Sequence, residues 1–282
     1  MIKFGPAGND KQFYADGFKS TVEAPKWLKT MGLSAFEYSF GKGILLKDET
    51  ALEIAAAMKE NDIAISVHAP YFINFANPDD EMVEKSYNYV LNSLYKLKLM
   101  GGNRCIIHVG SCGKLDREHA INLVAERLRI LVEKVKAAGY GDMLLCIETM
   151  GKQAQIGSFT EIIDLCKIDP MIIPTFDFGH INAVTGGTLK SKEDYEKIFD
   201  YCLESLGEFR TKNVHIHFSK IEYGAKGEIK HLTFEDDIYG PDFEPLAEVL
   251  KERNYTPVII CESKECMAID ALKMKNIFES LN

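Results

Sequence analysis

Histidine, aspartate and glutamate occur at the ends of six successive apolar runs in this sequence. These residues are His68 in ISVHAPY, His108 in CIIHVGS, Glu148 in LLCIETM, Asp177 and His180 in PTFDFGH, His215 and His217 in NVHIHFSK, and Glu262 in VIICESK. Imidazoles and carboxylates without cysteine suit Zn²⁺, Mn²⁺ or Fe²⁺ better than Ca²⁺ or a structural zinc site. Zinc is favoured because imidazoles are numerous. The ligands exceed the four that one zinc ion takes, so we expect two or three ions, with Glu148 placed to bridge a pair.

Each of these side chains also has a structural interpretation. A lone histidine at a strand end is more often a packed or supporting group than a ligand. Glu148 and Glu262 follow apolar residues, and an unpaired carboxylate is costly to bury there. A salt bridge to an inward Lys or Arg would remove that cost, but the neighbouring strand ends supply mainly imidazoles and carboxylates. A bound cation is therefore the simpler expectation.

The fold must bring these strand ends together. Short β-branched and apolar runs alternate with stretches of helical periodicity, which is typical of βα units on a parallel sheet. We predict strands near residues 2–7, 35–40, 63–70, 104–110, 143–149, 171–177, 213–218 and 257–262. The clearest predicted helices span residues 51–63, 84–101, 121–139, 243–254 and 267–281.

Eight such units without a Pro/Gly/Ser-rich linker predict a single (β/α)8 TIM barrel over residues 1–282. In such a barrel the C-terminal strand ends converge on one mouth. A doubly wound open sheet is the alternative, disfavoured because neither GxGxxG nor GxxxxGK[ST] follows the first strand. The longest irregular stretch, residues 219–241, exceeds an ordinary loop and is a candidate functional segment.

Composition limits the partners and the setting. The net charge of −9 provides no overall positive field for nucleic acid or anionic membranes, which argues weakly against a polyanionic substrate. Bound divalent ions would offset that charge locally. The seven cysteines show no CxxC spacing and are expected to be free thiols. No window has the ~20 apolar residues of a membrane span, and no secretory signal is visible, so we expect a cytoplasmic protein without membrane contact.

Six segments, in this order, resemble the endonuclease IV family of apurinic/apyrimidinic endonucleases, within the wider xylose-isomerase-like barrel superfamily. They are HAPYFIN (68–74), IIHVGS (106–111), ETMGKQAQIG (148–157), DFGH (177–180), VHIHFSK (214–220) and IICES (259–263). The resemblance covers residues 60 to 263. It implies one zinc on His68, His108 and Glu148, a second on Glu148, Asp177, His215 and Glu262, and a third that includes His180. It also implies that Tyr71 contacts DNA near the lesion, although Tyr71 is equally explained as a packing residue at the mouth, and Asn74 is expected to hold that loop.

The sequence departs from the family pattern at the third ion. The family has Asp-x-His in the seventh loop, and here the corresponding segment is GEIKHLTFEDD. His231 takes the histidine place, but Ile229 stands where the aspartate is expected. Glu228, Asp236 or Asp237 are the candidate replacements, and a weak, exchanging or absent third ion is the other interpretation.

Two enzyme functions and one non-enzymatic function are compatible with these residues. The first is hydrolysis of DNA at abasic sites by a monomeric metal-dependent phosphodiesterase, with Glu262 orienting or deprotonating water and Lys220 contacting substrate. Lysines expected near the mouth are Lys114, Lys152, Lys220, Lys226 and Lys230. The second is a sugar isomerase or epimerase with one ion on Glu148, Asp177, His215 and Glu262. The third is a binding module that keeps the fold without catalysis.

Overall fold

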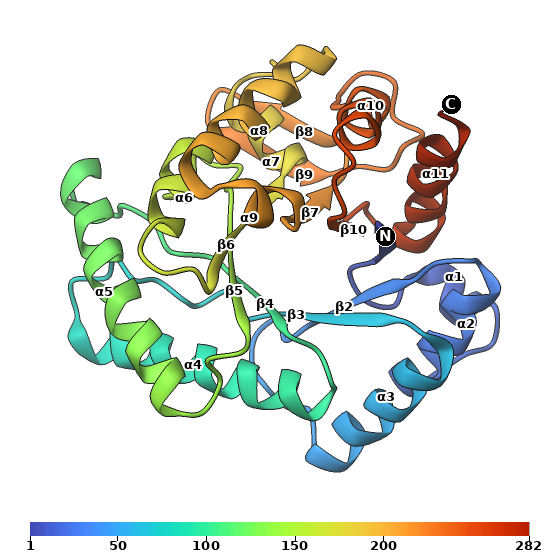
Figure 1. The fold of residues 1–282 in the computed structure, drawn as a ribbon, viewed down its shortest axis with the longest axis horizontal. Coiled ribbons are helices and arrows are strands. Elements are labelled where there is room, and N and C mark those ends of the chain that lie inside the picture. Colours follow the sequence, from blue (N-terminus) through green and yellow to red (C-terminus); the bar gives the residue numbers. More distant parts are fainter. Residues whose placement is uncertain (282) are drawn as a thin grey trace.

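Eight parallel strands form one sheet that curves into a nearly closed barrel (Figure 1). The structure is a computed structural model and describes residues 1–281. The strands are β1 (Lys3–Pro6), β2 (Ala35–Ser39), β3 (Ala64–His68), β4 (Arg104–Ile107), β5 (Leu144–Glu148), β6 (Ile172–Asp177), β7 (His215–Phe218) and β10 (Val258–Cys261). Their spatial order is β1-β10-β7-β6-β5-β4-β3-β2. All eight predicted strands and the barrel fold are confirmed.

The barrel closes where β1 approaches β2. The backbone N–H of Ser34 donates to the carbonyl oxygen of Phe4 at 2.9 Å, immediately before β2 begins. Gly5 is required at this seam, because a Cβ atom at that position would overlap the carbonyl oxygen of Ala35. A glycine in the first strand therefore allows the first and second strands to approach closely.

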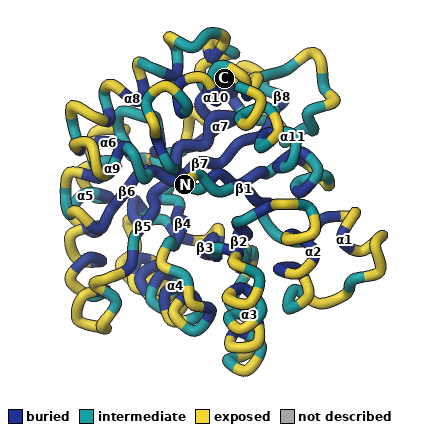
Figure 2. The backbone as a smooth tube through the Cα atoms, turned by 45° about the vertical axis from the view of Figure 1, so that its right-hand side comes forward, coloured by how far each residue is buried: buried dark blue, intermediate teal, exposed yellow. Residues whose placement is uncertain are grey.

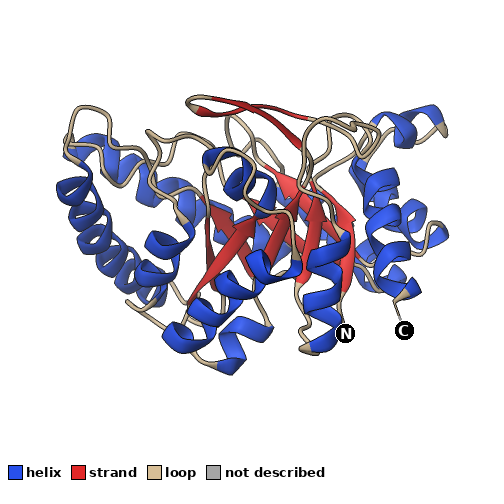
Figure 3. Ribbon diagram, turned by 90° about the horizontal axis from the view of Figure 1, so that it is seen from above, coloured by secondary structure: helices blue, strands red, loops and turns tan. Residues whose placement is uncertain are grey.

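Helices surround the sheet on its outside (Figure 3). They are α1 (Lys11–Ala15), the 3-10 helix η1 (Thr21–Glu23), α2 (Ala24–Thr30), α3 (Asp48–Asn61), α4 (Asp80–Leu99), α5 (Arg117–Ala137), α6 (Phe159–Cys166), α7 (Phe178–Val184), α8 (Lys192–Leu206), α9 (Glu208–Lys212), α10 (Glu244–Glu252) and α11 (Met267–Ser280). The five helices expected most clearly from periodicity are present as α3, α4, α5, α10 and α11. No helix among residues 1–281 combines the length and the apolar character needed to cross a bilayer.

The main hydrophobic core lies between the strands and the helices, and the strands are buried along most of their length (Figure 2). A separate small apolar cluster consists of Ile106, Cys146 and Ile173. These three residues are paired in register on β4, β5 and β6 and alternate with the residues that face the helices. Because side chains alternate across a strand, the small cluster fills the barrel interior.

The segment 219–241 contains an antiparallel hairpin, β8 (Ile221–Gly224) and β9 (Gly227–His231). The sequence predicted an irregular excursion here, and the structure shows that its first half is an antiparallel ribbon with one register shift, between Glu222 and Tyr223. The hairpin rests on the loop after β5, where the N–H of Glu228 donates to the carbonyl oxygen of Gly151 at 2.8 Å. A Cβ at Gly227, whose φ is 95°, would overlap that same carbonyl oxygen, so glycine permits the contact.

Candidate metal centre

The mouth of the barrel collects side chains from six strand ends. His68, Glu148 and Asp177 are the last residues of β3, β5 and β6, while His108 and Glu262 follow β4 and β10. A cavity of about 290 Å³ is lined by His68, Tyr71, His108, Glu148, Met150, Lys152, Gln155, His180, Glu228, His231 and Glu262. The parallel strands thus bring together residues up to about two hundred positions apart in the chain.

The two carboxylate oxygens of Glu148 face different histidines. Its Oε2 lies 3.2 Å from Nε2 of His68 and 2.9 Å from Nε2 of His108. Its Oε1 lies 2.9 Å from Nδ1 of His217. The carboxylate therefore stands between two clusters of donor atoms, which is the geometry of a group that bridges two ions.

The first cluster is His68, His108 and Glu148, whose ligand atoms all lie within 4.8 Å of one another. The second consists of Glu148, Asp177, His217 and Glu262, within the same limit. Oδ2 of Asp177 is buried and makes no hydrogen bond within residues 1–281, although Nδ1 of His180 lies 3.2 Å from it. Its Oδ1 accepts from the N–H of His180 at the start of α7. A buried carboxylate oxygen without a donor is costly unless a cation meets it, so this donor set fits a divalent metal ion.

The assignment of His215 to the second cluster is corrected by the structure, which places His217 there instead. Both side chains point into the barrel because they are two residues apart on β7. His217 pairs in register with Asp177, at the level of the mouth, whereas His215 pairs with Thr175, about 7 Å deeper at two residues of strand rise. His215 therefore cannot join the mouth residues.

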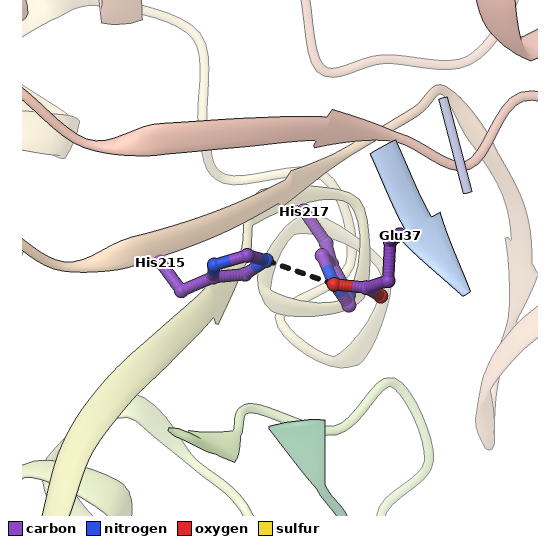
Figure 4. A group of neighbouring side chains, drawn as sticks. All are labelled: Glu37, His215 and His217. Carbon is purple, nitrogen blue, oxygen red and sulfur yellow. Dashed lines mark hydrogen bonds and ion pairs between the residues drawn. The ribbon is translucent and has the colours of Figure 1, made fainter. Parts of the chain in front are cut away.

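Glu37, which the sequence analysis missed, is the partner of His215 (Figure 4). It lies on β2 and is fully buried, and its Oε2 is 3.0 Å from Nε2 of His215. Its Oε1 is 2.9 Å from Nε2 of His217. The single charged residue in the run AFEYSF was the signal available in the sequence.

The third cluster is His180, Glu228 and His231. Nε2 of His180 is 3.5 Å from Glu228 Oε2, and Nε2 of His231 is 3.8 Å from Glu228 Oε1. Ile229 points outward and is 57% exposed. Of the three candidate replacements for the missing aspartate, the structure brings Glu228 to the histidines, while Asp236 accepts hydrogen bonds from the N–H groups of Ile238 and Tyr239 within its own loop.

Hydrogen bonds at the far ring nitrogens orient three histidines. Nδ1 of His68 lies 2.8 Å from the carbonyl oxygen of Ala69, and Nδ1 of His180 lies 3.0 Å from that of Thr149. A carbonyl only accepts, so each Nδ1 donates, and Nε2 is left to bind a cation in the neutral ring. Nδ1 of His231 pairs with the Ser219 hydroxyl at 2.8 Å.

The electrostatics of the mouth favour added positive charge. Burial lowers the pKa of an imidazole, but the hydrogen bond to Glu148 and the charges of Glu148, Glu37 and Glu262 raise the pKa of His68 to about 9. Burial is likewise outweighed at His180, where Asp177, Glu148 and Glu228 raise the pKa to about 9. The carboxylates thus draw protons onto the histidines, and divalent ions would occupy the same negative field.

The pKa values of the two carboxylates at the mouth, Glu148 and Glu262, are shifted in opposite directions. Burial raises the pKa of Glu262, because the nearby His217 does not fully offset the loss of water and the charge of Glu148. At Glu148 burial is overcome by His217, His108 and His68, which hold its pKa well below the usual range. Glu148 is therefore the permanent anion, and Glu262 is the group that takes a proton more readily.

The remaining predicted residues fall in different places. The Tyr71 ring is 56% exposed beside the mouth, with its centroid 5.5 Å from that of His68. Oδ1 of Asn74 accepts from the N–H groups of Ala76 and Ser111, which ties the loop after β3 to the loop after β4. Lys220 Nζ donates to the carbonyl oxygen of Asp236 and pairs with Asp242, so it is engaged within its own loop. Lys152 is a lysine in the lining of the 290 Å³ cavity, beside its histidines.

Sequence comparison finds relatives that match all or part of this chain. An uncharacterized protein of Methanocaldococcus jannaschii is 30% identical over 100% of this chain and 98% of its own length. A probable endonuclease 4 of Acholeplasma laidlawii is 29% identical over 61% of this chain and 60% of its own length. The chain thus spans less than two thirds of that relative, and the likeness to endonuclease 4 sequences expected from the motifs is confirmed.

Solved structures share the fold. The endonuclease IV of Thermus thermophilus superposes with a TM-score of 0.68 at 18% identity, covering 99% of this chain and 98% of that chain. A D-tagatose 3-epimerase-like protein superposes with a TM-score of 0.72 at 18% identity, covering 99% and 96%. Residues 25–276 match the family described as xylose isomerase-like TIM barrel. This protein is a member of the xylose isomerase-like TIM barrel family.

Proposed function

We propose that this protein is a metal-dependent phosphodiesterase that cleaves DNA at abasic sites. The observation that carries the proposal is the position of Glu148, whose Oε2 faces His68 and His108 while its Oε1 faces His217. A third cluster adjoins these two. Two donor clusters that share one carboxylate, with a third beside them, suit two or three ions, and the five imidazoles favour zinc.

Such a centre supplies what phosphodiester hydrolysis needs. When bound, divalent ions neutralise charge on the phosphoryl group and on the leaving oxygen. Glu262 orients the attacking water and accepts its proton, because burial raises its pKa and its side chain is 19% exposed toward the cavity. Glu148 would bind two ions at once and would stay ionised throughout.

The surroundings of the cavity support an extended anionic substrate. Pockets lie on both sides of Tyr71: one is lined by Ser39 and Met267, the other by Asn74 and Ser111. A substrate that runs past the metal centre in two directions fits this shape better than a small enclosed one. The net charge of −9 makes the ions themselves the main source of local positive potential. The probable endonuclease 4 relatives point the same way.

A sugar isomerase or epimerase is the second candidate. Glu148, Asp177, His217 and Glu262 form a complete four-ligand set for one ion without help from the other clusters. Proton or hydride transfer next to a carbonyl needs no second ion. Metal stoichiometry therefore separates the two functions, one ion per chain favouring the isomerase.

The test is a parallel assay of one zinc-loaded preparation. The protein is incubated with a duplex that contains one abasic site, with the intact duplex, and with a panel of ketohexoses. Strand cleavage confined to the abasic duplex, with two or three zinc ions per chain, is expected. An abasic duplex left uncut beside an authentic endonuclease IV that cuts it would contradict the proposal, and sugar conversion would favour the second candidate. A metal-loaded sample inert toward both classes would favour a binding module.

A further inference from the structure

Glu37 belongs to neither of the clusters that contain Glu148, yet its carboxylate reaches one of their ligands. It is fully buried in the barrel interior, below the mouth. Its Oε2 accepts from the Ser66 hydroxyl at 2.8 Å and from Nε2 of His215 at 3.0 Å. These two donors fix the plane of the carboxylate and direct its Oε1 toward β7.

Oε1 of Glu37 and Nε2 of His217 lie close together but are not joined by a hydrogen bond. The two atoms lie 2.9 Å apart, both are buried, and neither makes a hydrogen bond of good geometry with any group in residues 1–281 (Figure 4). The other nitrogen of the ring, Nδ1, faces Glu148 at 2.9 Å and Glu262 at 3.6 Å. His217 therefore spans from the metal centre to the interior carboxylate.

The chemistry of imidazole assigns the proton. A ring nitrogen binds a cation through its lone pair, so Nδ1 of His217 carries no proton when it is a ligand. The single proton of the neutral ring is then on Nε2, which lies 2.9 Å from Oε1 of Glu37. A carboxylate that accepts the second proton of a ligating histidine fixes its tautomer and raises its basicity.

We propose that Glu37 is a positioning residue that holds the Nε2 proton of His217 and so presents Nδ1 to the ion bound with Glu148, Asp177 and Glu262. His215 and Ser66 orient Glu37 for this role. The inference rests on the proposed metal centre but not on the substrate, so a protein that binds zinc and leaves abasic DNA uncut would still test it.

The first experiment reads the tautomer directly. Full-length protein with ¹⁵N-labelled histidine is loaded with Zn²⁺, and long-range ¹H–¹⁵N correlation spectra distinguish a protonated from a zinc-bound ring nitrogen. The His217 signals are assigned from their loss in His217→Gln. We expect zinc on Nδ1 and the proton on Nε2. Zinc on Nε2 with the proton on Nδ1 would overturn the proposal.

The second experiment measures Zn²⁺ affinity by competition with a chelating dye. Glu37→Gln removes the charge at nearly constant volume and is expected to weaken the affinity of the ion at His217 by about 10- to 100-fold and to shift the His217 ¹⁵N signals. Asp10→Asn is the matched control, because Asp10 is also buried but accepts from the backbone N–H groups of Phe13 and Ala268, away from the clusters. A purely structural role for Glu37 would lower stability and leave affinity and signals unchanged, which would overturn the proposal.

A milder variant covers the case in which Glu37→Gln fails to fold. Ser66→Ala removes one donor that orients Glu37, and a loss of affinity below about tenfold, with a smaller shift of the same signals, is expected. Unchanged affinity and signals in Ser66→Ala would count as refutation. So would an anomalous zinc peak between Glu37, His215 and His217, since these residues would then be ligands themselves.

Discussion

The strand-borne and loop-borne parts of the proposed metal centre differ in how firmly the structure holds them. The side chains of His68, Glu148 and His217 are 7%, 1% and 0% exposed and belong to strands hydrogen-bonded on both sides. Glu228 and His231 are 15% and 26% exposed and belong to the β8–β9 hairpin, whose strands pair only with each other among the described strands. Ligands on a rigid barrel lose less freedom on binding an ion than ligands on a hairpin. The first two clusters should therefore bind ions tightly, and the third should exchange its ion more readily.

The largest effect should follow from the residue shared by both tight clusters. Glu148→Gln removes the anion that faces His68, His108 and His217, so we expect loss of both tightly bound ions and of all detectable activity. Leaving buried histidines without their carboxylate should also cost about 3–5 kcal/mol of unfolding free energy in the metal-free protein. Metal content by mass spectrometry and urea denaturation measure these effects. Glu126→Gln, on the exposed face of α5, is the control, and an unchanged zinc content in Glu148→Gln would refute the bridging role.

Metal removal should change how stability depends on pH. In the chelated protein the pKa values of His68 and His180, each about 9, lie above the usual histidine value. A raised folded-state pKa adds stability that is complete below pH ~6.5 and is lost as the pH rises through about 9. The melting temperature of the chelated protein should therefore fall between these values. The zinc-loaded protein should lack this fall, because ions replace the protons. Equal pH profiles for both forms would contradict the electrostatic description of the mouth.

Removing the carboxylate of the loop-borne cluster should cost one ion and part of the activity, but little stability. Glu228→Gln is expected to reduce zinc from three ions to two at limiting free zinc, with activity lowered by about 10- to 100-fold and stability nearly unchanged. Ile229→Asp is the informative control. It restores the Asp-x-His pattern of the family. Residue 229 is 57% exposed and is the unpaired residue at the register shift of the hairpin, so we expect the metal content to stay unchanged. Increased zinc affinity in Ile229→Asp would mean that the hairpin shifts its register on binding.

The sequence was sufficient to predict the barrel and the strand-end side chains that meet at its mouth, because both depend on simple periodicity. Once eight parallel strands are recognised, a polar residue directly after an apolar run is expected at the mouth of the barrel, as His68 and Glu262 are. His215 and His217 show the limit of this reasoning. They share one face of β7, and only the register of Asp177 with His217 determines which one reaches the mouth.

Glu37 and Glu228 needed tertiary information. Glu37 sits in the second strand, and its partner on β7 is 178 residues away, so no local pattern connects them. At Glu228 the spacing to His231 differs from the family pattern, and which of Glu228, Asp236 and Asp237 faces His180 depends on how the hairpin rests on Gly151. Contacts between residues far apart in the chain are the feature that is hardest to predict from a single sequence.

The smallest effect is expected outside the metal clusters, at Lys152. Its side chain is exposed and lines the cavity, so it can meet a substrate phosphate without holding an ion. An exposed charge contributes only modestly, and Lys152→Met should raise KM for the abasic duplex by about two- to fivefold while kcat and zinc content stay unchanged. The difference in KM between variant and wild type should vanish at high salt, because screening then removes the contribution of Lys152 in the wild type as well.

Lys220→Met provides the contrast. Because Lys220 already pairs with Asp242 and the Asp236 carbonyl, this variant should lose stability without the salt-dependent change in KM. If instead Lys220→Met alone raised KM, the segment 219–241 would have to open when DNA binds. The contrast between the rigid strand-borne ligands and the looser hairpin would then apply to substrate recognition as well.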